Sequence, residues 1–373
     1  MHWLFAIAGK KFISSFLLFL FLQNCFAVTK TWTGLAGDGL WSSPNNWSGN
    51  SIPLITDDVL LDNSVIGSSY TASFSLTSVT VSVNSLTITP ASGNTIQLTI
   101  PNSNTANPGL NVTGLGDALI LNNGAILMNS TGVASGGVGL AITNTFRINN
   151  GAKYVHNNVR ANASIVSQLS TVSGTENGIF EYDVPAAAGY TASISNRKYG
   201  TLIFSATAAG GTKVYTGTGS NPLIITGDLQ INSGATMNVD LASVNGNIII
   251  NGNYIQNGGT FNVSSGAGDN SIVKIKGNIT QTSGIITETN TGLPVIELDG
   301  TAQQTVSMQG TIMNSVSFRI NNSAGAILSA PLILPYKLEL LNGNITTSST
   351  NLLTLQTGAT ISVDSTIANT SYI

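Results

Sequence analysis

The sequence predicts an all-β protein, namely a right-handed parallel β-helix (β-solenoid) with an N-terminal cap. Three observations favour this fold. Apolar and polar residues alternate along many short segments, turn-forming Asn/Gly units recur every 15 to 27 residues or about one solenoid coil, and charged residues make up only 8% of the chain. Because 42% of the residues are hydrophobic, the chain can bury a core, which argues against disorder.

Strict alternation identifies the strands. Val81 and Val83 flank a serine, and residues 96–100 alternate between aliphatic and polar side chains. A period of two is the signature of a strand with one buried face. The same pattern recurs at 229–231, 237–241, 273–276, 318–320 and 338–340. No window of the sequence predicts a helix.

A recurrent turn unit follows many of these strands. It reads Asn-Asn-Gly or a close variant between an aliphatic residue and an alanine, at 121–125, 148–152, 231–235 and 320–324. Asn and Gly tolerate left-handed backbone angles, so each unit is expected to turn the chain. Stacked coils would then align aliphatic residues inside and Asn or Ser/Thr side chains in hydrogen-bonded ladders. The alternative is that Asn-Gly marks hairpins, which would give tandem antiparallel β-sandwiches; the repetition favours the solenoid.

Residues 1–27 are predicted to be a signal peptide. Lys10 and Lys11 precede an apolar stretch at 12–22, and Ala27 ends a cleavage-site pattern. The stretch is shorter than the roughly 18 to 20 residues of a membrane span, so the mature chain is expected to lack a transmembrane segment. Cleavage also removes Cys25, the only cysteine. The sequence therefore predicts an exported, disulfide-free protein located outside the cell or on its outer surface.

The mature chain is expected to divide into four regions. Residues 28–59 form a Trp-rich N-terminal cap, residues 60–171 and 223–373 form solenoid coils, and residues 172–222 form either elaborated coils or an insertion. Residues 172–222 depart from the repeat pattern, because charged and aromatic residues concentrate there. The formal net charge is −3 and no basic stripe is present, so nucleic acid is not an expected partner.

Two stretches of sequence resemble known secreted proteins. The first is 31–59, in which Trp32, Trp41 and Trp47 are spaced by glycines and followed by Asp57-Asp58. It resembles the N-terminal motif of large secreted bacterial β-helix proteins, including autotransporter-like surface proteins. Residues 180–204 with 231–235, and residues 338–360, resemble repeat regions of Bacteroidetes proteins exported by type IX secretion.

This resemblance implies a location at the cell surface or outside the cell, and it implies no activity. Proteins of this kind usually end in a C-terminal sorting domain. The sequence up to Ile373 shows only further repeat-like segments. The favoured expectation is therefore that the chain is an N-terminal fragment of a longer protein, with coils that continue beyond it. The alternative is that the protein leaves the cell by another route.

The tryptophans admit two interpretations. Trp32, Trp41 and Trp47 could plug the open end of the solenoid core, which needs a cap. Their indole faces could instead stack on the sugar rings of a glycan. The cap is the favoured interpretation.

Acid–base chemistry has two sets of candidate residues. The first resembles the basic residues and Tyr or His of β-helix polysaccharide lyases, which need a base and a cation beside a uronate carboxylate. Its members are Lys153, Tyr154, His156, Arg160, Arg197 and Lys198. The second set could supply the paired carboxylates of a glycoside hydrolase, and comprises Glu176, Glu181 and Asp183. The alternative for both sets is an ordinary solvated surface.

Calcium is the only cofactor that the sequence leaves open. Carboxylates gather at two places, namely Asp57, Asp58 and Asp62 after the tryptophan motif, and Glu297 with Asp299. Ca²⁺ takes six to eight oxygen ligands, and neither place has the spacing of a known calcium loop. No other metal or cofactor is predicted.

The expected function is therefore that of a non-enzymatic, secreted or cell-surface scaffold, adhesive or glycan-binding. Its partners would be extracellular glycans, matrix or neighbouring cells. The alternative is a β-helix polysaccharide lyase or glycoside hydrolase acting on extracellular polysaccharide. That alternative requires a groove along one face in which charged residues from several coils converge.

Overall fold

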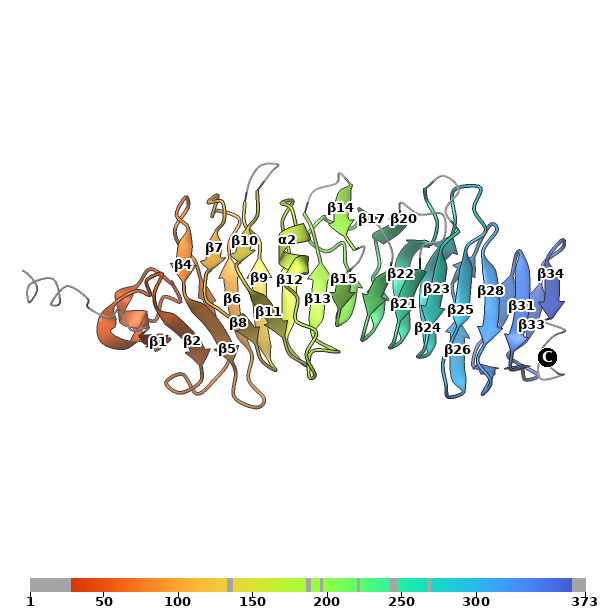
Figure 1. Ribbon diagram of the computed structural model, residues 1–373, viewed down its shortest axis with the longest axis horizontal. Coiled ribbons are helices and arrows are strands. Elements are labelled where there is room, and N and C mark those ends of the chain that lie inside the picture. Colours follow the sequence, from red (N-terminus) through yellow and green to blue (C-terminus); the bar gives the residue numbers. More distant parts are fainter. Residues whose placement is uncertain are drawn as a thin grey trace, which may run out of the picture.

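The protein is an elongated parallel β-solenoid of about 13 turns, with 47% of its residues in strands and 3% in helices. The computed structural model describes residues 28–132, 137–185, 189–194, 197–219, 222–241, 247–266 and 270–363. Successive strands stack along the long axis of the molecule, from β1 at one end to β34 at the other (Figure 1). Every strand pair in the described residues is parallel, which excludes tandem antiparallel sandwiches.

One sheet runs the length of the solenoid and is here called the long sheet. Its main path joins strands of successive coils. They are β3 (Tyr70–Ser73), β6 (Ile96–Ile100), β9 (Ala125–Asn129), β12 (Lys153–His156), β13 (Ile179–Tyr182), β16 (Thr201–Phe204), β19 (Leu229–Ile231), β22 (Tyr254–Asn262), β24 (Ile279–Thr287), β26 (Gln304–Met308), β29 (Ala326–Leu328) and β32 (Ile345–Thr346).

The second face of the solenoid is formed by two separate sheets, one N-terminal and one C-terminal. The N-terminal sheet comprises β1 (Thr29–Thr31), β2 (Asp58–Asp62), β5 (Ser85–Thr89), β8 (Asp117–Leu121) and β11 (Thr145–Ile148). The C-terminal sheet comprises β15 (Arg197–Tyr199), β18 (Leu223–Ile225), β21 (Asn247–Ile250), β23 (Ile272–Ile275), β25 (Val295–Leu298), β28 (Ser317–Asn321), β31 (Lys337–Asn342) and β34 (Thr360–Val363). Between the two sheets, the isolated bridge from Phe146 to Leu169 is the only strand-like pairing on this face in the described residues.

The third face is the most interrupted. It begins with a sheet of β4 (Val81–Val83), β7 (Leu110–Val112) and β10 (Leu140–Ile142). Next along this face come β14 (Tyr190–Ser193), β17 (Lys213–Gly219) and β20 (Ala235–Leu241), which pair in that order. β20 also pairs with the C-terminal part of β22, which continues through β24 to β27 (Thr311–Ile312). A separate pair, β30 (Leu332–Leu334) and β33 (Leu353–Leu355), ends this face.

The core and the ladders form as predicted. Leu86, Leu119 and Phe146 are register partners on successive coils and are fully buried. Asn149 donates to the Asn122 Oδ1 atom at 2.7 Å, across 27 positions of sequence. Gly124 in the turn has a φ of 83°, and a Cβ there would lie 2.4 Å from the carbonyl oxygen of Asn94. Glycine is therefore required both by the left-handed turn and by the close stacking of coils.

Region 172–222 consists of coils wherever it is described. Its strands β13, β16 and β17 pair in register with strands on either side. The unexpected element is α2 (Ala163–Ser167), a short helix that contacts β10 and β14. Asn162, just before it, donates to the Thr191 carbonyl at 3.2 Å and accepts from the Ser193 N–H at 2.9 Å. One side-chain amide thus pairs the edge of β14 as a neighbouring strand would.

Candidate functional site

Strand β12 separates the predicted lyase residues onto two faces. Tyr154 and His156 point into the core, and both are 0% exposed. Lys153 points outward and forms an ion pair with Glu181 at 2.8 Å. Tyr154 and His156 therefore share one face of the strand, and it is the inner face, which no polysaccharide can reach.

The buried His156 belongs to a hydrogen-bonded network. Its Nε2 atom lies 2.7 Å from the Tyr190 hydroxyl, which donates to the Arg160 carbonyl. Its Nδ1 atom lies 3.3 Å from the Tyr154 hydroxyl. A neutral ring protonated on Nε2 satisfies both contacts. Burial lowers the pKa of His156 to about 4, so the side chain is neutral near pH 7.

The tyrosines of region 172–222 are core residues as well. Tyr182 and Tyr199 are buried with their hydroxyls 2.9 Å apart, and Tyr215 donates to the Ser205 carbonyl at 2.6 Å. Burial raises the pKa of all three hydroxyls. The aromatic concentration that set this region apart in sequence is therefore a packed, hydrogen-bonded interior.

Arg160 binds backbone rather than substrate. Its guanidinium is buried and donates to the carbonyls of Ala106, Val138, Thr105 and Gly132 at 2.7 to 3.1 Å. These carbonyls belong to loops of the two preceding coils. The side chain therefore clamps three neighbouring coils together, a role that its position in sequence did not indicate.

Three of the remaining predicted acid–base residues, Lys153, Glu181 and Asp183, form a cluster with Ser205 at the long sheet. It is here called the outer cluster. Glu181 accepts hydrogen bonds from Lys153 at 2.8 Å and from the Ser205 hydroxyl at 2.5 Å. Asp183 accepts from the Ala208 N–H at 2.9 Å. Burial, with the nearby charge of Glu181, raises the pKa of Asp183. Two carboxylates thus lie together, one of them paired with a lysine.

Three predicted residues lie away from the outer cluster. Glu176 is exposed in the turn before β13 and accepts from the Gly174 N–H at 2.8 Å; backbone hydrogen bonds lower its pKa. Arg197 and Lys198 belong to β15 of the C-terminal sheet, a different face of the solenoid. The structure therefore does not assemble the six predicted lyase residues into one site.

Two grooves adjoin this part of the molecule. The first, of about 490 Å³, crosses several coils, and the described residues that line it are amides, hydroxyls and small apolar residues. Asn102, Ser130 and Asn157 are among them, and no titratable side chain is. The second, of about 530 Å³, has Arg160 and Tyr190 among its lining residues, both engaged in the bonds described above. Neither groove gathers charges from several coils.

The tryptophans close the N-terminal end of the core. Trp32, Trp41 and Trp47 are 1%, 2% and 1% exposed. Trp47 meets both of the others edge to face, at ring distances of 4.9 and 4.5 Å, and its Nε1 atom donates to the Trp41 carbonyl at 2.8 Å. No indole face is open to a sugar ring. The geometry agrees with a cap and is incompatible with glycan stacking on these residues.

The aspartates near β2 do not converge on one point. Asp57 is buried and accepts from the Leu54 N–H at 2.8 Å, closing a turn. Asp58 accepts from Asn84 and Ser85 on the next coil, whereas Asp62 stands at the far end of β2. Among the residues that the structure describes, no group of three or more His, Cys, Asp or Glu side chains could hold a metal ion.

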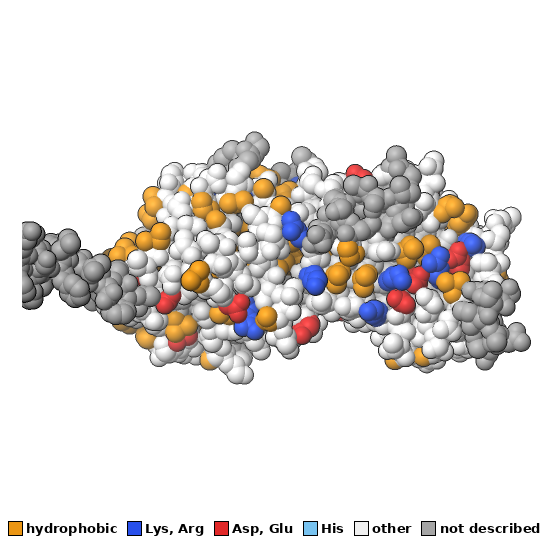
Figure 2. Space-filling model, viewed as in Figure 1, with side chains coloured by type: hydrophobic (Ala, Val, Ile, Leu, Met, Phe, Trp, Pro, Cys, Tyr) orange, Lys and Arg blue, Asp and Glu red, His pale blue; other side chains and the backbone are white. Residues whose placement is uncertain are grey.

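Glu297 and Asp299 are part of an ionic ladder on the C-terminal sheet. Lys274, Glu297, Arg319 and Glu339 are register partners on four successive strands. Glu297 lies 3.3 Å from Lys274 and 2.8 Å from Arg319, and Arg319 lies 2.6 Å from Glu339. Figure 2 shows the alternating signs as a row of blue and red over β23 to β31.

Charge pairing dominates this ladder. Burial alone would raise the pKa of Glu297, but hydrogen bonds from Arg319 and Asn321 and the charge of Lys274 outweigh it and hold the pKa low. The pKa of Glu339 is lowered in the same way by Lys337 and Arg319. These carboxylates already have cationic partners, so they do not form an open calcium site.

A signal for this ladder was present in the sequence. In each of four segments, at 272–275, 295–298, 317–320 and 337–340, a charged residue stands between two buried apolar ones. Aligning these four segments would place lysine, glutamate, arginine and glutamate in one column. The alternation of sign would then predict pairing across coils.

Three helical segments occur in the described residues. They are α2 and the 3-10 turns η1 (Pro44–Asn46) and η2 (Ser48–Asn50). In this part of the chain no helix has the length and apolar character needed to cross a membrane. No family model, curated protein or solved structure matches the chain.

Proposed function

We propose that the protein is a non-enzymatic scaffold, exported from the cell, that presents its stacked sheet faces to extracellular glycans. One observation carries the proposal. The side chains best suited to acid–base chemistry are used by the fold itself: Tyr154 and His156 lie in the core, and Arg160 binds backbone carbonyls. The surface that remains is mainly amide and hydroxyl, which suits contact with uncharged sugars.

Export rests on the predicted signal peptide, which lies outside the described residues. The measurement is the N-terminal sequence of protein recovered from the medium or the cell surface. Processing after Ala27 would leave Val28 as the first residue. Recovery of the unprocessed chain from the cell interior would contradict the proposed export.

The scaffold proposal predicts binding without degradation. The mature protein would be incubated with a panel of acidic and neutral polysaccharides, followed by assays for new reducing ends and for the ultraviolet absorbance of unsaturated uronates. We expect neither signal, together with retention of the protein on at least one insoluble glycan. Degradation that is lost in a Lys153→Met variant would overturn the proposal.

The outer cluster favours one second candidate, a glycoside hydrolase. Glu181 and Asp183 lie close enough to interact, and the raised pKa of Asp183 is the direction that a general acid requires. The test is hydrolysis by the unmodified protein compared with Glu181→Gln and Asp183→Asn variants. Equal absence of activity in all three leaves the scaffold as the better description.

A further inference from the structure

The basic side chains that lack a partner gather at one end of the C-terminal sheet. Of the 13 Lys and Arg residues, two lie in the predicted signal peptide, and the structure describes the other 11. Eight of these pair with carboxylates or donate to carbonyls and hydroxyls. The exceptions are Arg197, Lys198 and Lys276, whose side chains make no hydrogen bond or ion pair within the described residues. All three lie on or directly after β15 and β23.

Two of these residues lie on the outer face of the sheet, with isoleucines between them. Lys198, Ile224, Ile249 and Lys274 are register partners on four successive strands. Ile224 and Ile249 are partly exposed, whereas their neighbours along each strand are buried. Lys276 follows Lys274 by two positions and is exposed, so it shares this face. These five residues are here called the cationic face. Figure 2 shows blue side chains over β15 and β23 with hydrophobic ones between them.

The strands of the cationic face carry no carboxylate to balance these charges. The described residues of β15, β18, β21 and β23 include no aspartate or glutamate. On the C-terminal side, Glu297 and Asp299 lie 3.3 and 3.9 Å from Lys274. On the N-terminal side, Glu176 lines the same small hollow as Lys198 without pairing with it in the described residues. Lys198 and Lys276 therefore remain available to an anion from outside.

The spacing of the lysines favours a ligand with repeated negative charges. Neighbouring strands are about 4.8 Å apart, so β15 and β23, three steps apart in the sheet, are separated by roughly 14 Å. One small anion does not span this distance between side chains that both point outward. Between the charges, Ile224 and Ile249 present aliphatic surface. The ligand must therefore alternate anionic groups with uncharged, partly apolar units.

An acidic peptide strand is a less suitable ligand for this face. A bound strand needs backbone partners at a free sheet edge. β18 and β21 are paired on both sides, so their peptide groups are already used by the sheet. The backbone of a peptide laid over them would gain no such partners. A chain of acidic sugars has no backbone amides to satisfy, and the C–H groups of its rings suit the isoleucines.

We propose that the cationic face binds an acidic polysaccharide, a chain of uronate sugars that lies along the solenoid axis. Its carboxylates would pair with Lys198 and Lys276, and the C–H faces of the rings between them would rest on Ile224 and Ile249. This inference rests on the proposed glycan-binding function and names the class of glycan and the face that holds it.

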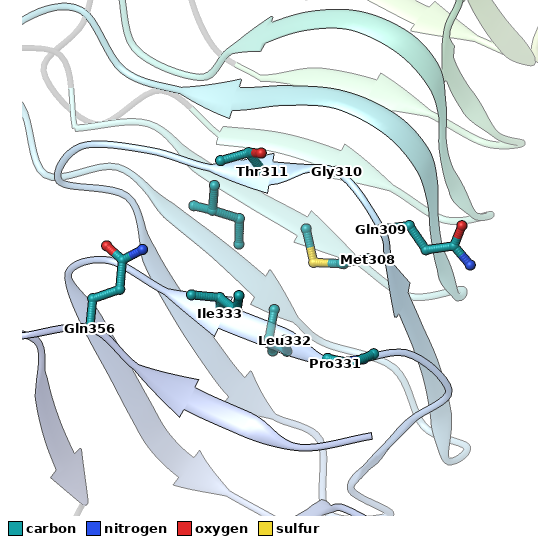
Figure 3. Close-up of a pocket in the computed structure, with 9 residues that line it drawn as sticks. Met308, Gln309, Gly310, Thr311, Pro331, Leu332, Ile333 and Gln356 are labelled. Carbon is teal, nitrogen blue, oxygen red and sulfur yellow. The ribbon is translucent and has the colours of Figure 1, made fainter. Parts of the chain in front are cut away.

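Openings elsewhere in the described residues lack this charge. A cavity of about 390 Å³ lies between β27 and β30, where Met308, Gln309 and Leu332 are among the lining residues, none of which is charged (Figure 3). The groove of about 490 Å³ described above has no titratable side chain in its described lining. A uronate chain would find no counter-charge in either opening.

The experiment compares one sugar chain in a charged and an uncharged form. The mature protein would be titrated calorimetrically with hexagalacturonate and with its fully methyl-esterified form, which has the same length and linkage. We expect at least tenfold tighter binding of the charged form at low ionic strength. The preference should disappear at about 1 M salt, where the Debye length is about 3 Å. Equal binding of the two forms at low salt would overturn the proposal.

Variants locate the binding on the cationic face. Ile249→Glu places a carboxylate between the lysines and should abolish hexagalacturonate binding, whereas Ile249→Gln, of the same size, should retain most of it. Lys198→Gln should weaken binding at least fivefold. Lys30→Gln removes the same charge near β1, away from this face, and should leave binding unchanged. Circular dichroism checks that each variant folds, and the salt dependence of the unmodified protein needs no variant.

A second polyanion tests the assignment to a sugar. Binding to phosphatidylglycerol vesicles without binding to hexagalacturonate would overturn the sugar in favour of a lipid surface. Hexagalacturonate binding that is equally strong in the Ile249→Glu and Ile249→Gln variants would overturn the cationic face as its site.

The two proposals fail in distinguishable ways. If the protein is retained on neutral glycans but binds hexagalacturonate and its ester alike, the cationic face is not an acidic-glycan site and the scaffold function stands. If unsaturated uronates appear during incubation, the scaffold function fails whatever the cationic face binds.

Discussion

The central coils around β12 to β17 and the C-terminal coils from β23 to β34 treat polar residues in opposite ways. The central coils place histidine, tyrosine and asparagine inside, where they are neutral and hydrogen-bonded. In the described residues the C-terminal coils bury the amides of Gln281, Gln304 and Asn322 but no histidine or tyrosine, and they place lysine, arginine and glutamate outside, in register. Both regions are built from parallel strands stacked in register. The difference shows that a solenoid can carry polar groups inside if they stay uncharged, and charges outside if neighbouring coils alternate in sign.

The largest expected effect comes from removing the clamp in the central coils. Arg160→Met would leave four carbonyls in two loops, including those of Ala106 and Gly132, without this donor. We expect a loss of about 3 to 5 kcal/mol in the free energy of unfolding, measured in urea. Lys198→Met, on an exposed side chain, is the matched control and should cost under about 0.5 kcal/mol. Equal effects would mean that the clamp contributes little.

Acid should loosen the central coils first. The pKa of His156 is about 4 in the folded protein and 6.5 as a reference, so the unfolded chain binds the proton more readily. The contribution of the neutral His156 to the free energy of unfolding is fully present above pH 6.5. It is lost as the pH drops toward 4, by about 3 kcal/mol in total. His156 is the only histidine outside the predicted signal peptide.

Thermal melts between pH 7 and pH 4.5 would test this. His156→Gln should remove most of the pH dependence in that window. The carboxylates of the ladder act below it, because their pKa values are lowered and their stabilisation is lost only as the pH falls below about 4.5. A melting temperature that stays constant down to pH 4.5 in the unmodified protein would contradict the buried, neutral histidine.

A smaller loss in the free energy of unfolding is expected from breaking the ionic ladder on the C-terminal sheet. Arg319→Met would leave Glu297, whose side chain is only 3% exposed, with a hydrogen bond from Asn321 and with Lys274 as its remaining cationic partner. We expect a cost of about 2 kcal/mol, less than for a fully buried pair because Arg319 is partly exposed. Adding Glu297→Gln to the same chain should restore part of the loss. Urea unfolding of both variants decides whether charge imbalance or lost packing causes the effect.

The smallest expected effect is an increase in the free energy of unfolding, from extending a ladder of buried glutamines. In the core of the C-terminal coils the Gln281 amide donates to Gln256 at 3.0 Å, but its own Oε1 atom has no partner in the described residues. Met308 is the register partner of Gln281 on the next coil. Met308→Gln should extend the ladder and stabilise the protein by about 1 kcal/mol. Met308→Leu, which adds no donor, should give no gain in urea unfolding.

Much of the fold was predictable from sequence because it depends on local patterns. Alternation in residues 96–100 marked β6, and the Asn-Asn-Gly unit at 121–125 marked the turn between β8 and β9. The tryptophan cap followed from three large aromatic residues at one end of a repeat. Helix α2 was missed, since five residues give too short a pattern to detect.

What the sequence determined alone is which side chains share a face, because the period of two is a property of the strand itself. It did not determine which face is inside at β12, where Lys153, Tyr154, Val155 and His156 alternate without a clear apolar side. That was decided by two aromatic neighbours, namely Phe146 on the preceding strand β11 and Phe180 on the next coil. The clamp at Arg160 likewise depends on how three neighbouring coils stack, and that stacking is settled only when distant segments pack.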